Sequence, residues 1–206
     1  MEFIDNQRIT LGEDLKKEIK QGSKLSIAAA CFSIYAFQEL KEQLTQIDEL
    51  RFIFTSPTFV AEKVKKEKRE FYIPRLTRER SLYGTEFEIK LRNELTQKAV
   101  AKECADWIRQ KVTFRSNVSD QVIQGGIVAD NIGYTPINEF TAVELGSENG
   151  NVISTTIVKD ESLAQKLLSD FNEIWNDSTL LQEVTDKVIE SISSADCKIN
   201  LNIFHK

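Results

Sequence analysis

A largely apolar run of eight residues, Leu25–Phe32, constrains the fold more than any other stretch of this 206-residue sequence. A run of this length without clear alternation is typical of a strand that is buried on both faces of a sheet. The consecutive alanines Ala28–Ala30 leave a helix as the alternative. The elements on either side indicate which of the two applies.

Helical patterns flank this run. Before it, Thr10 and Glu13 have the spacing of a capping box, and the apolar stripe that follows stops at Gly22. After it, apolar residues recur at helical spacing over residues 36–47, and a second short buried strand follows over residues 49–56. The order helix, strand, helix, strand predicts an α/β layer with parallel strands.

The middle of the chain predicts one long helix and then a strand. Thr85 and Glu88 form a second capping box, and helical spacing continues to about Gln110. From Val112 the sequence VTFRSN alternates apolar and polar residues, as a half-buried strand does. We expect the long helix to lie across one face of the sheet.

The remaining elements are strands followed by helices. Residues 121–146 contain two strand-like runs joined by a turn, and Asn149-Gly150-Asn151 is a hairpin signal before the run NVISTTIVKD. Two amphipathic helices are predicted at Ser162–Trp175 and Thr179–Ser193. Together these elements predict an α/β (α+β) fold with a mixed sheet between helices.

The three cysteines, Cys31, Cys104 and Cys197, are far apart and have no CxxC spacing. Such spacing argues against a disulfide framework and against a zinc site. We expect reduced thiols, with Cys31 in the core, and we expect no metal and no cofactor. The sequence contains no run of eighteen apolar residues and no signal-peptide pattern, so we expect a cytoplasmic protein.

The net charge of −5 is unevenly distributed. Residues 63–80, KVKKEKREFYIPRLTRER, have eight Lys and Arg against three Glu, so they carry +5 and the rest of the chain −10. Such a strip can hold the phosphates of DNA or RNA while aromatic rings stack on bases. The candidate contacts are Lys63, Lys65, Lys66, Lys68, Arg69, Phe71, Tyr72, Arg75, Arg78 and Arg80. The alternative is a charged loop that only contacts solvent.

Several motifs together resemble a known family. GEDLKKEIKQGSKLSIAAACFSIYAFQELKEQL, LRFIF, VTFRSN, NEFTAVELG, GNVISTTIV and FNEIWND occur in that order. They resemble the phospholipase D-like (HKD phosphodiesterase) domain at the amino terminus of bacterial superfamily 2 helicases, including restriction and defence proteins. The resemblance implies a single phospholipase D-like domain over residues 1–206, with a basic insert at about 60–84. It also implies a DNA helicase motor, which would follow where the chain ends.

Active members of that family carry an HxK motif, then a Gly-Ser-x-Asn element, then an Asn-x-Glu element. With NEFT as the anchor, HxK falls on Gln124-Gly125-Gly126, so Gln replaces His and Gly replaces Lys. The Ser and Asn of the second element fall on Asn138 and Glu139. Asn151 of the third element is kept, but Ile153 replaces its acidic residue. Phe140 and Thr141 match the family and serve packing as readily as chemistry.

The chemistry of this family needs an imidazole nucleophile and a lysine that neutralises phosphoryl charge. The only histidine is His205, beside the last residue, where a rigid supporting shell is rare. A metal-dependent nuclease would need a carboxylate cluster, and the spacing of the candidates matches no motif. Those candidates are Asp5, Asp120, Asp130, Glu139 and Glu144.

Three hypotheses follow for the function. The first is a catalytically degenerate domain that binds nucleic acid or serves as an assembly module of a helicase or restriction-type protein. The second is a surviving phosphodiesterase. The third is a dimerisation module in which Gly125-Gly126 lets the backbone of a partner approach closely.

Overall fold

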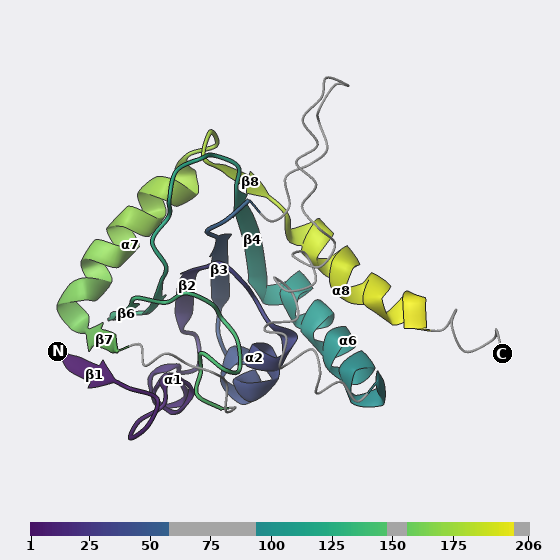
Figure 1. Cartoon of the computed structure of the whole chain (residues 1–206), viewed down its shortest axis with the longest axis horizontal. Helices are drawn as coiled ribbons and strands as arrows, with labels where there is room; N and C mark the ends of the chain where they lie inside the picture. The colour runs from purple at the N-terminus through teal and green to yellow at the C-terminus, as the bar shows by residue number, and fades with distance from the viewer. Residues whose placement is uncertain (58–93, 148–155, 200–206) are drawn as a thin grey trace.

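The computed structural model describes residues 1–57, 94–147 and 156–199. Within these ranges the elements follow in the order shown in Figure 1. They are β1 (Glu2–Ile4), α1 (Leu11–Glu18), β2 (Lys24–Ala29), α2 (Ile34–Glu39), α3 (Lys41–Leu44), β3 (Glu49–Phe54), α6 (Glu94–Lys111), β4 (Val112–Asn117), β5 (Gly126–Ala129), β6 (Ile132–Thr135), β7 (Ile157–Asp160), α7 (Glu161–Asn176), β8 (Leu181–Glu183) and α8 (Thr185–Ile199).

The described strands form one mixed sheet of eight strands in the order β1-β7-β6-β5-β2-β3-β4-β8. Strands β2, β3 and β4 are parallel to one another, and the other pairs are antiparallel. Ala28 of β2 pairs with Ile53 of β3 on one side and with Gly126 of β5 on the other. The predicted buried strand and its parallel partner are therefore confirmed, and so is the mixed α/β class.

Helices cover both faces of the sheet. Figure 1 shows α7 along one side and α6 with α8 along the other. On the α6 side, the buried core includes side chains of α1, α2, β3 and β4, with a group of packed aromatic rings at its centre. On the α7 side, a smaller cluster joins Ile53 to Phe171 and Trp175. The expected arrangement of a sheet between helices is confirmed at this level.

Local signals explain where several elements begin. The Thr10 hydroxyl accepts a hydrogen bond from Glu13 N at 3.1 Å, and the Glu13 carboxylate accepts one from Thr10 N at 3.2 Å. This is the predicted capping box, and it satisfies two amides at the start of α1. The β5–β6 hairpin is confirmed as well. It turns at Asp130, whose carboxylate accepts a hydrogen bond from Lys24 N at 2.8 Å.

The structure corrects two predicted elements and adds one that was not predicted. The predicted helix over residues 36–47 is divided into α2 and α3 at Leu40. The predicted helix at Thr179–Ser193 begins only at Thr185, because Leu181–Glu183 pairs with the free edge of β4 as strand β8. Strand β1 was not predicted, since three residues are too few to show alternation. The Thr85 capping box and the Asn149–Asn151 turn lie outside the described residues.

Two further expectations concerned the state of the cysteines and the presence of membrane-spanning segments. Cys31 and Cys104 are both buried and form no disulfide in the described part of the chain, and Cys31 lies in the core as predicted. Burial raises the pKa of the Cys104 thiol well above its ordinary value. Among the helices of the described ranges, none is both long enough and apolar enough to cross a membrane.

A buried polar network joins α1 to β6 and β7. The Asp14 carboxylate accepts a hydrogen bond from the Tyr134 hydroxyl at 2.8 Å and one from Lys159 Nζ at 3.0 Å. Lys159 also donates to Glu18 at 2.7 Å. Burial lowers the pKa of Lys159, but these two carboxylates raise it more, so the net shift is upward. The network therefore holds the amino-terminal helix on the antiparallel half of the sheet.

We predict that Asp14→Ala lowers the free energy of unfolding by about 3 kcal/mol, because it leaves the buried Tyr134 hydroxyl without its acceptor and the partly buried Lys159 ammonium with one carboxylate fewer. Urea unfolding measures the effect. Asp106→Ala is the matched control, since it breaks the exposed Asp106–Arg109 ion pair and should cost less than about 0.5 kcal/mol. Equal losses in the two variants would contradict the role of the network.

Candidate functional site

The positions that the family resemblance aligns with HxK lie at the edge of the sheet where β2 ends and β5 begins. Gly126 is the first residue of β5 and pairs with Ala28. Gln124 and Gly125 come just before it, and the Gln124 side chain is exposed. Because β2 is central in the sheet, these residues lie beside the carboxyl end of its parallel strands.

Gly125 is in unusually close contact with Ile137 of the same chain. A Cβ atom built on Gly125 would lie 1.7 Å from the Ile137 carbonyl oxygen, which leaves no room for any side chain. The Ile137 amide also donates a hydrogen bond to the Gly125 oxygen at 3.3 Å. The backbone that lies against Gly125 in the described structure is therefore that of Ile137 in the same chain. At Gly126 the nearest atom to such a Cβ is the Tyr134 oxygen at 3.2 Å.

The segment after β6 returns to the same edge. The Asn138 oxygen accepts a hydrogen bond from Ala30 N at 2.9 Å, and Phe140 N donates to the Cys31 oxygen at 2.8 Å. Asn138 and Glu139 thus run beside the residues that follow β2, while Gln124 and Asn138 flank the Gly125–Ile137 contact. The structure brings together four of the five degenerate positions: Gln124, Gly126, Asn138 and Glu139. Asn151 lies outside the described residues.

The family-like residues Phe140 and Thr141 have structural roles. Phe140 is buried in the aromatic group and stacks on Phe32 with ring centroids 6.1 Å apart. The Thr141 hydroxyl accepts a hydrogen bond from Glu144 N at 3.1 Å and so caps the turn that follows. After Ile137 the chain is irregular, with one isolated bridge between Phe32 and Phe140 and then a turn.

Glu144 is an acidic residue of this region whose pKa is shifted in the folded protein. Its carboxylate accepts a hydrogen bond from Asn138 N at 3.3 Å. Burial raises the pKa of Glu144 above its ordinary value of 4.5; the Asn138 hydrogen bond lowers it, and the Glu139 charge raises it. The net shift is upward, so the folded protein holds this proton more tightly than the unfolded chain does.

An asparagine that the sequence analysis did not single out joins two loops at this edge. Asn117, at the end of β4, donates through Nδ2 to the Thr55 oxygen at 2.9 Å and to the Gln121 oxygen at 2.8 Å. Its Oδ1 accepts from Ser119 N at 2.9 Å. The loop before β5 is thereby attached to the end of β3. No sequence pattern indicated this, because a single buried asparagine has no periodic signature.

The whole predicted nucleic-acid-binding surface lies outside the described residues. The predicted contacts are Lys63, Lys65, Lys66, Lys68, Arg69, Phe71, Tyr72, Arg75, Arg78 and Arg80, and all belong to that part of the chain, as does His205. The last described residues before this basic segment, Thr55–Pro57, follow β3 at the same sheet edge as Gln121.

The candidate metal ligands are separated in the structure. Asp5 accepts hydrogen bonds from Gln7 N and Arg8 N in its own turn, whereas Asp130 accepts from Lys24 N. Within the described ranges, no group of three or more His, Cys, Asp or Glu side chains lies close enough to hold a metal ion. The geometry of these carboxylates is that of turn and capping groups.

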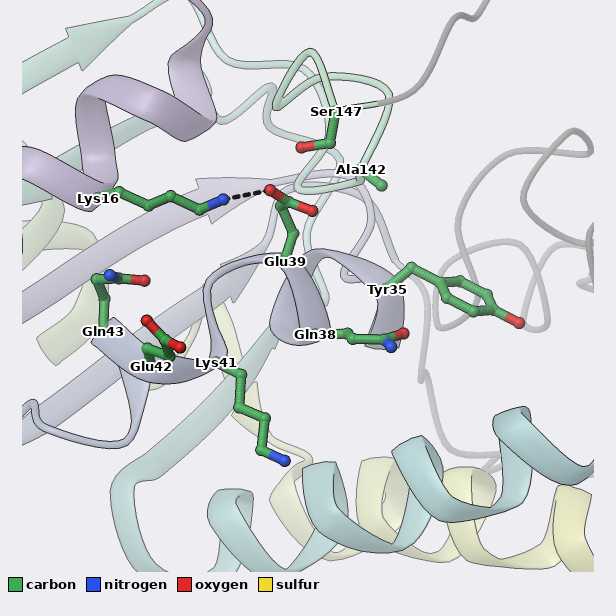
Figure 2. Close-up of a pocket in the computed structure, with 9 residues that line it drawn as sticks. All are labelled: Lys16, Tyr35, Gln38, Glu39, Lys41, Glu42, Gln43, Ala142 and Ser147. Carbon is green, nitrogen blue, oxygen red and sulfur yellow. Dashed lines mark hydrogen bonds and ion pairs between the residues drawn. The ribbon is translucent and has the colours of Figure 1, made fainter.

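A polar hollow of about 700 Å³ lies between α1, α2, α3 and the turn after Thr141 (Figure 2). Lys16 reaches across it and forms an ion pair with Glu39, while Lys41 pairs with Glu103 at 2.7 Å. Its lining includes none of the positions aligned with HxK. Because these two lysines already have carboxylate partners, the hollow carries little net positive charge for an anion.

Another cluster missed by the sequence analysis lies on the α7 face of the sheet. Arg51 of β3 and Arg115 of β4 both stack on Trp175, with guanidinium carbons 5.6 Å and 4.5 Å from the ring centroid. Arg51 also lies 5.0 Å from the Phe171 ring centroid. The FNEIWND segment of α7 therefore provides an aromatic platform for two arginines.

Comparison of the sequence with models of known protein families and with curated proteins finds no match. The phospholipase D-like resemblance thus depends on the motifs themselves and on where their residues lie.

We predict that Gly125→Ala lowers the free energy of unfolding by about 3 kcal/mol, because the added methyl group overlaps the Ile137 carbonyl and forces the two segments apart. Chemical denaturation measures the loss. Gly126→Ala is the control, and it should cost less than about 1 kcal/mol, since its Cβ has ordinary or only slightly tight contacts. A Gly125→Ala protein as stable as the wild type would refute the close contact.

We predict that Glu144→Gln reduces the pH dependence of stability. Above pH 4.5 the unfolded chain has released the Glu144 proton while the folded protein still holds it, so wild-type stability falls as pH rises through this window. Glutamine has no proton to release and can still accept the Asn138 hydrogen bond. Thermal unfolding between pH 4.5 and 7 should show Glu144→Gln gaining stability relative to wild type as pH rises. Parallel profiles for the two proteins would contradict the prediction.

Proposed function

We propose that this chain is a phospholipase D-like domain that has lost its HxK pair and binds nucleic acid without cleaving it. The observation that supports this most is the meeting of residues far apart in sequence. Gln124 and Gly126 align with HxK, Asn138 and Glu139 align with the next family element, and backbone hydrogen bonds hold both groups at one sheet edge. The antiparallel β5–β6 hairpin is the element that brings these two groups together.

The side chains at the HxK positions cannot perform the family reaction. A glutamine amide is not a nucleophile towards phosphorus, and glycine offers no positive charge to stabilise a phosphorane-like transition state. The sole histidine in the sequence is His205. It is followed directly by Lys206, so it does not form an HxK motif. The edge therefore retains the backbone frame of such a site with different side chains.

Nucleic acid is the ligand that the charge distribution favours. Residues 63–80 carry +5 within a chain of net charge −5, so an anionic polymer would be attracted to one segment and repelled elsewhere. The described chain enters this segment from Pro57, close to the edge that carries Gln121 and Gln124.

The same proposal includes the expected context of the domain. A helicase motor, in the same chain or in a partner, would use this domain to bind DNA or to assemble a restriction-type complex. The domain itself would bind and position the nucleic acid, and the motor would hydrolyse ATP. The alternative of a surviving phosphodiesterase requires a nucleophile that the aligned positions do not offer.

We predict salt-sensitive binding of DNA or RNA that depends on the basic segment. A variant with Lys63, Lys65, Lys66 and Lys68 changed to Gln should bind fluorescent oligonucleotides at least tenfold more weakly. The salt slope for duplex DNA should fall by about 0.9 for each phosphate that the variant no longer neutralises. Fluorescence anisotropy at several salt concentrations measures both quantities, with single-stranded and duplex DNA and RNA as separate probes.

The control variant changes four exposed lysines of the described residues, Lys17, Lys20, Lys102 and Lys166, to Gln and so removes the same charge. It should bind with a smaller loss of affinity than the basic-segment variant. The absence of salt-sensitive binding to every probe would refute the binding role, and cleavage of a probe by the wild-type protein would refute the loss of catalysis.

A further inference from the structure

Arg51 and Arg115 form a pair of like charges on the α7 face of the sheet. Arg51 is in β3, where it pairs in register with Thr113, and Arg115 follows two residues later on the neighbouring strand β4. Side chains two residues apart on a strand point to the same face, so the two arginines are diagonal neighbours. Both are partly buried.

Neither arginine has a carboxylate partner among the described residues, since no ion pair within 4.0 Å there involves either of them. The acidic residues nearest in register are Glu49, two positions before Arg51, and Glu183, opposite Arg115 on β8. Both glutamates are exposed. A buried or half-buried charge is usually paired, so this pair is an exception that needs an explanation.

The two guanidinium groups donate to neutral partners. Arg51 donates to Asn172 Oδ1 at 2.8 Å and to Ser26 Oγ at 2.9 Å. Arg115 donates through Nη1 to the Trp175 oxygen, but its Nε is buried and has no hydrogen-bond partner within the described structure. Each guanidinium has five N–H groups, and these partners occupy only some of them.

The electrostatic cost of the pair is visible at Arg51. Burial lowers its pKa, the Glu49 charge raises it, and the Arg115 charge lowers it again, with a net downward direction. A guanidinium stays protonated in spite of such shifts, so the cost is borne as lost stability. An anion placed between the two groups would remove that cost.

We propose that Arg51 and Arg115 form a binding site for a phosphate group. Two planar donor forks fixed by Phe171 and Trp175 match the several acceptor oxygens of a tetrahedral oxyanion. Stacking on the rings holds the guanidinium groups in place, and the N–H groups that Asn172, Ser26 and the Trp175 oxygen do not use remain as donors. The site uses only described residues, and none of them belongs to the basic segment 63–80.

The arrangement of the described helices leaves this part of the sheet open to a ligand. Helix α7 packs mainly over β6, β5 and β2, on the half of the sheet that does not carry the arginines. Its carboxyl-terminal side chains Phe171, Asn172 and Trp175 are the ones that reach the arginines. On the same face, Thr113 and Glu183 of β4 and β8 are at least partly exposed, so the described elements do not cover these strands.

Thermal unfolding in sodium phosphate against sodium chloride of equal ionic strength tests the site. At a phosphate concentration ten times the Kd, wild-type Tm should rise by about 3 to 6 °C. Arg51→Gln and Arg115→Gln should lose this rise, whereas the exposed Arg109→Gln should keep it. A rise of equal size in all four proteins would reflect general exclusion of phosphate from the surface and would overturn the proposal.

A second measurement uses the wild-type protein, in case an arginine variant fails to fold. Phenylglyoxal modifies accessible arginines, and peptide mass spectrometry locates the modified residues. Phosphate should slow modification of Arg51 and Arg115 severalfold and leave that of Arg109 unchanged. Lack of selective protection would overturn the proposal even if thermal shifts were ambiguous.

An oligonucleotide arm identifies the source of the phosphate. If Arg51→Gln or Arg115→Gln weakens oligonucleotide binding about tenfold, the phosphate belongs to a nucleic-acid strand. If phosphate protects both arginines but oligonucleotide affinity is unchanged, the site is confirmed for a free phosphate or a small phosphate ester. Failure of every protein to bind oligonucleotides would refute the proposed function and leave this site standing.

Discussion

Strand β2 is the constraint on which the rest of the structure depends, because it joins the two halves of the sheet. On one side it pairs parallel with β3, and on the other it pairs antiparallel with β5. A strand with partners on both edges and helices over both faces must be apolar along its length, since its side chains meet little solvent. The run Leu25–Phe32 meets this requirement, and small alanines at Ala28 and Ala29 let the neighbouring layers approach closely.

The two faces of the sheet are stabilised in different ways. Towards α6 and α8, the buried rings of Phe32, Phe52 and Phe114 pack against one another in edge-to-face and tilted arrangements. Towards α7, Phe171 and Trp175 stack on each other and on two arginines, so this layer contains charge. An apolar core on one side can tolerate a costly like-charge pair on the other. This division of roles is the physical reason to look for a ligand on the α7 side.

Local patterns in the sequence predicted the elements that depend on short-range physics. The Thr10 capping box, the apolar run of β2 and the stripe of α7 are each determined by residues within one element. Elements that depend on distant partners were missed or misplaced. Leu181 has helical spacing to Val184 and Val188, yet it enters a strand because the free edge of β4 offers backbone partners.

The candidate site shows the same limit. The family pattern assigned Gln124 and Asn138 to two different motifs. The contact between the two segments is made by their neighbours, through the backbones of Gly125 and Ile137. The sequence did not predict the Arg51–Arg115 pair either. The two residues are 64 positions apart and become neighbours only through the register of β3 and β4. Sequence patterns indicate the type of an element and which of its faces is buried. Functional sites form where residues from distant segments meet, which such patterns do not indicate.

This geometry is also compatible with the proposed loss of the HxK pair, because packing at this edge restricts the backbone more than the side chains. At the edge of β5 the residue that packing restricts is Gly125, whose Cβ would collide with a backbone oxygen. Gln124 beside it is exposed, so its side chain contributes little to the core and is free to change. The backbone bonds from Asn138 and Phe140 to the chain after β2 need no particular side chain either. Packing therefore constrains the backbone at Gly125 but leaves the exposed side chain at position 124 free to vary.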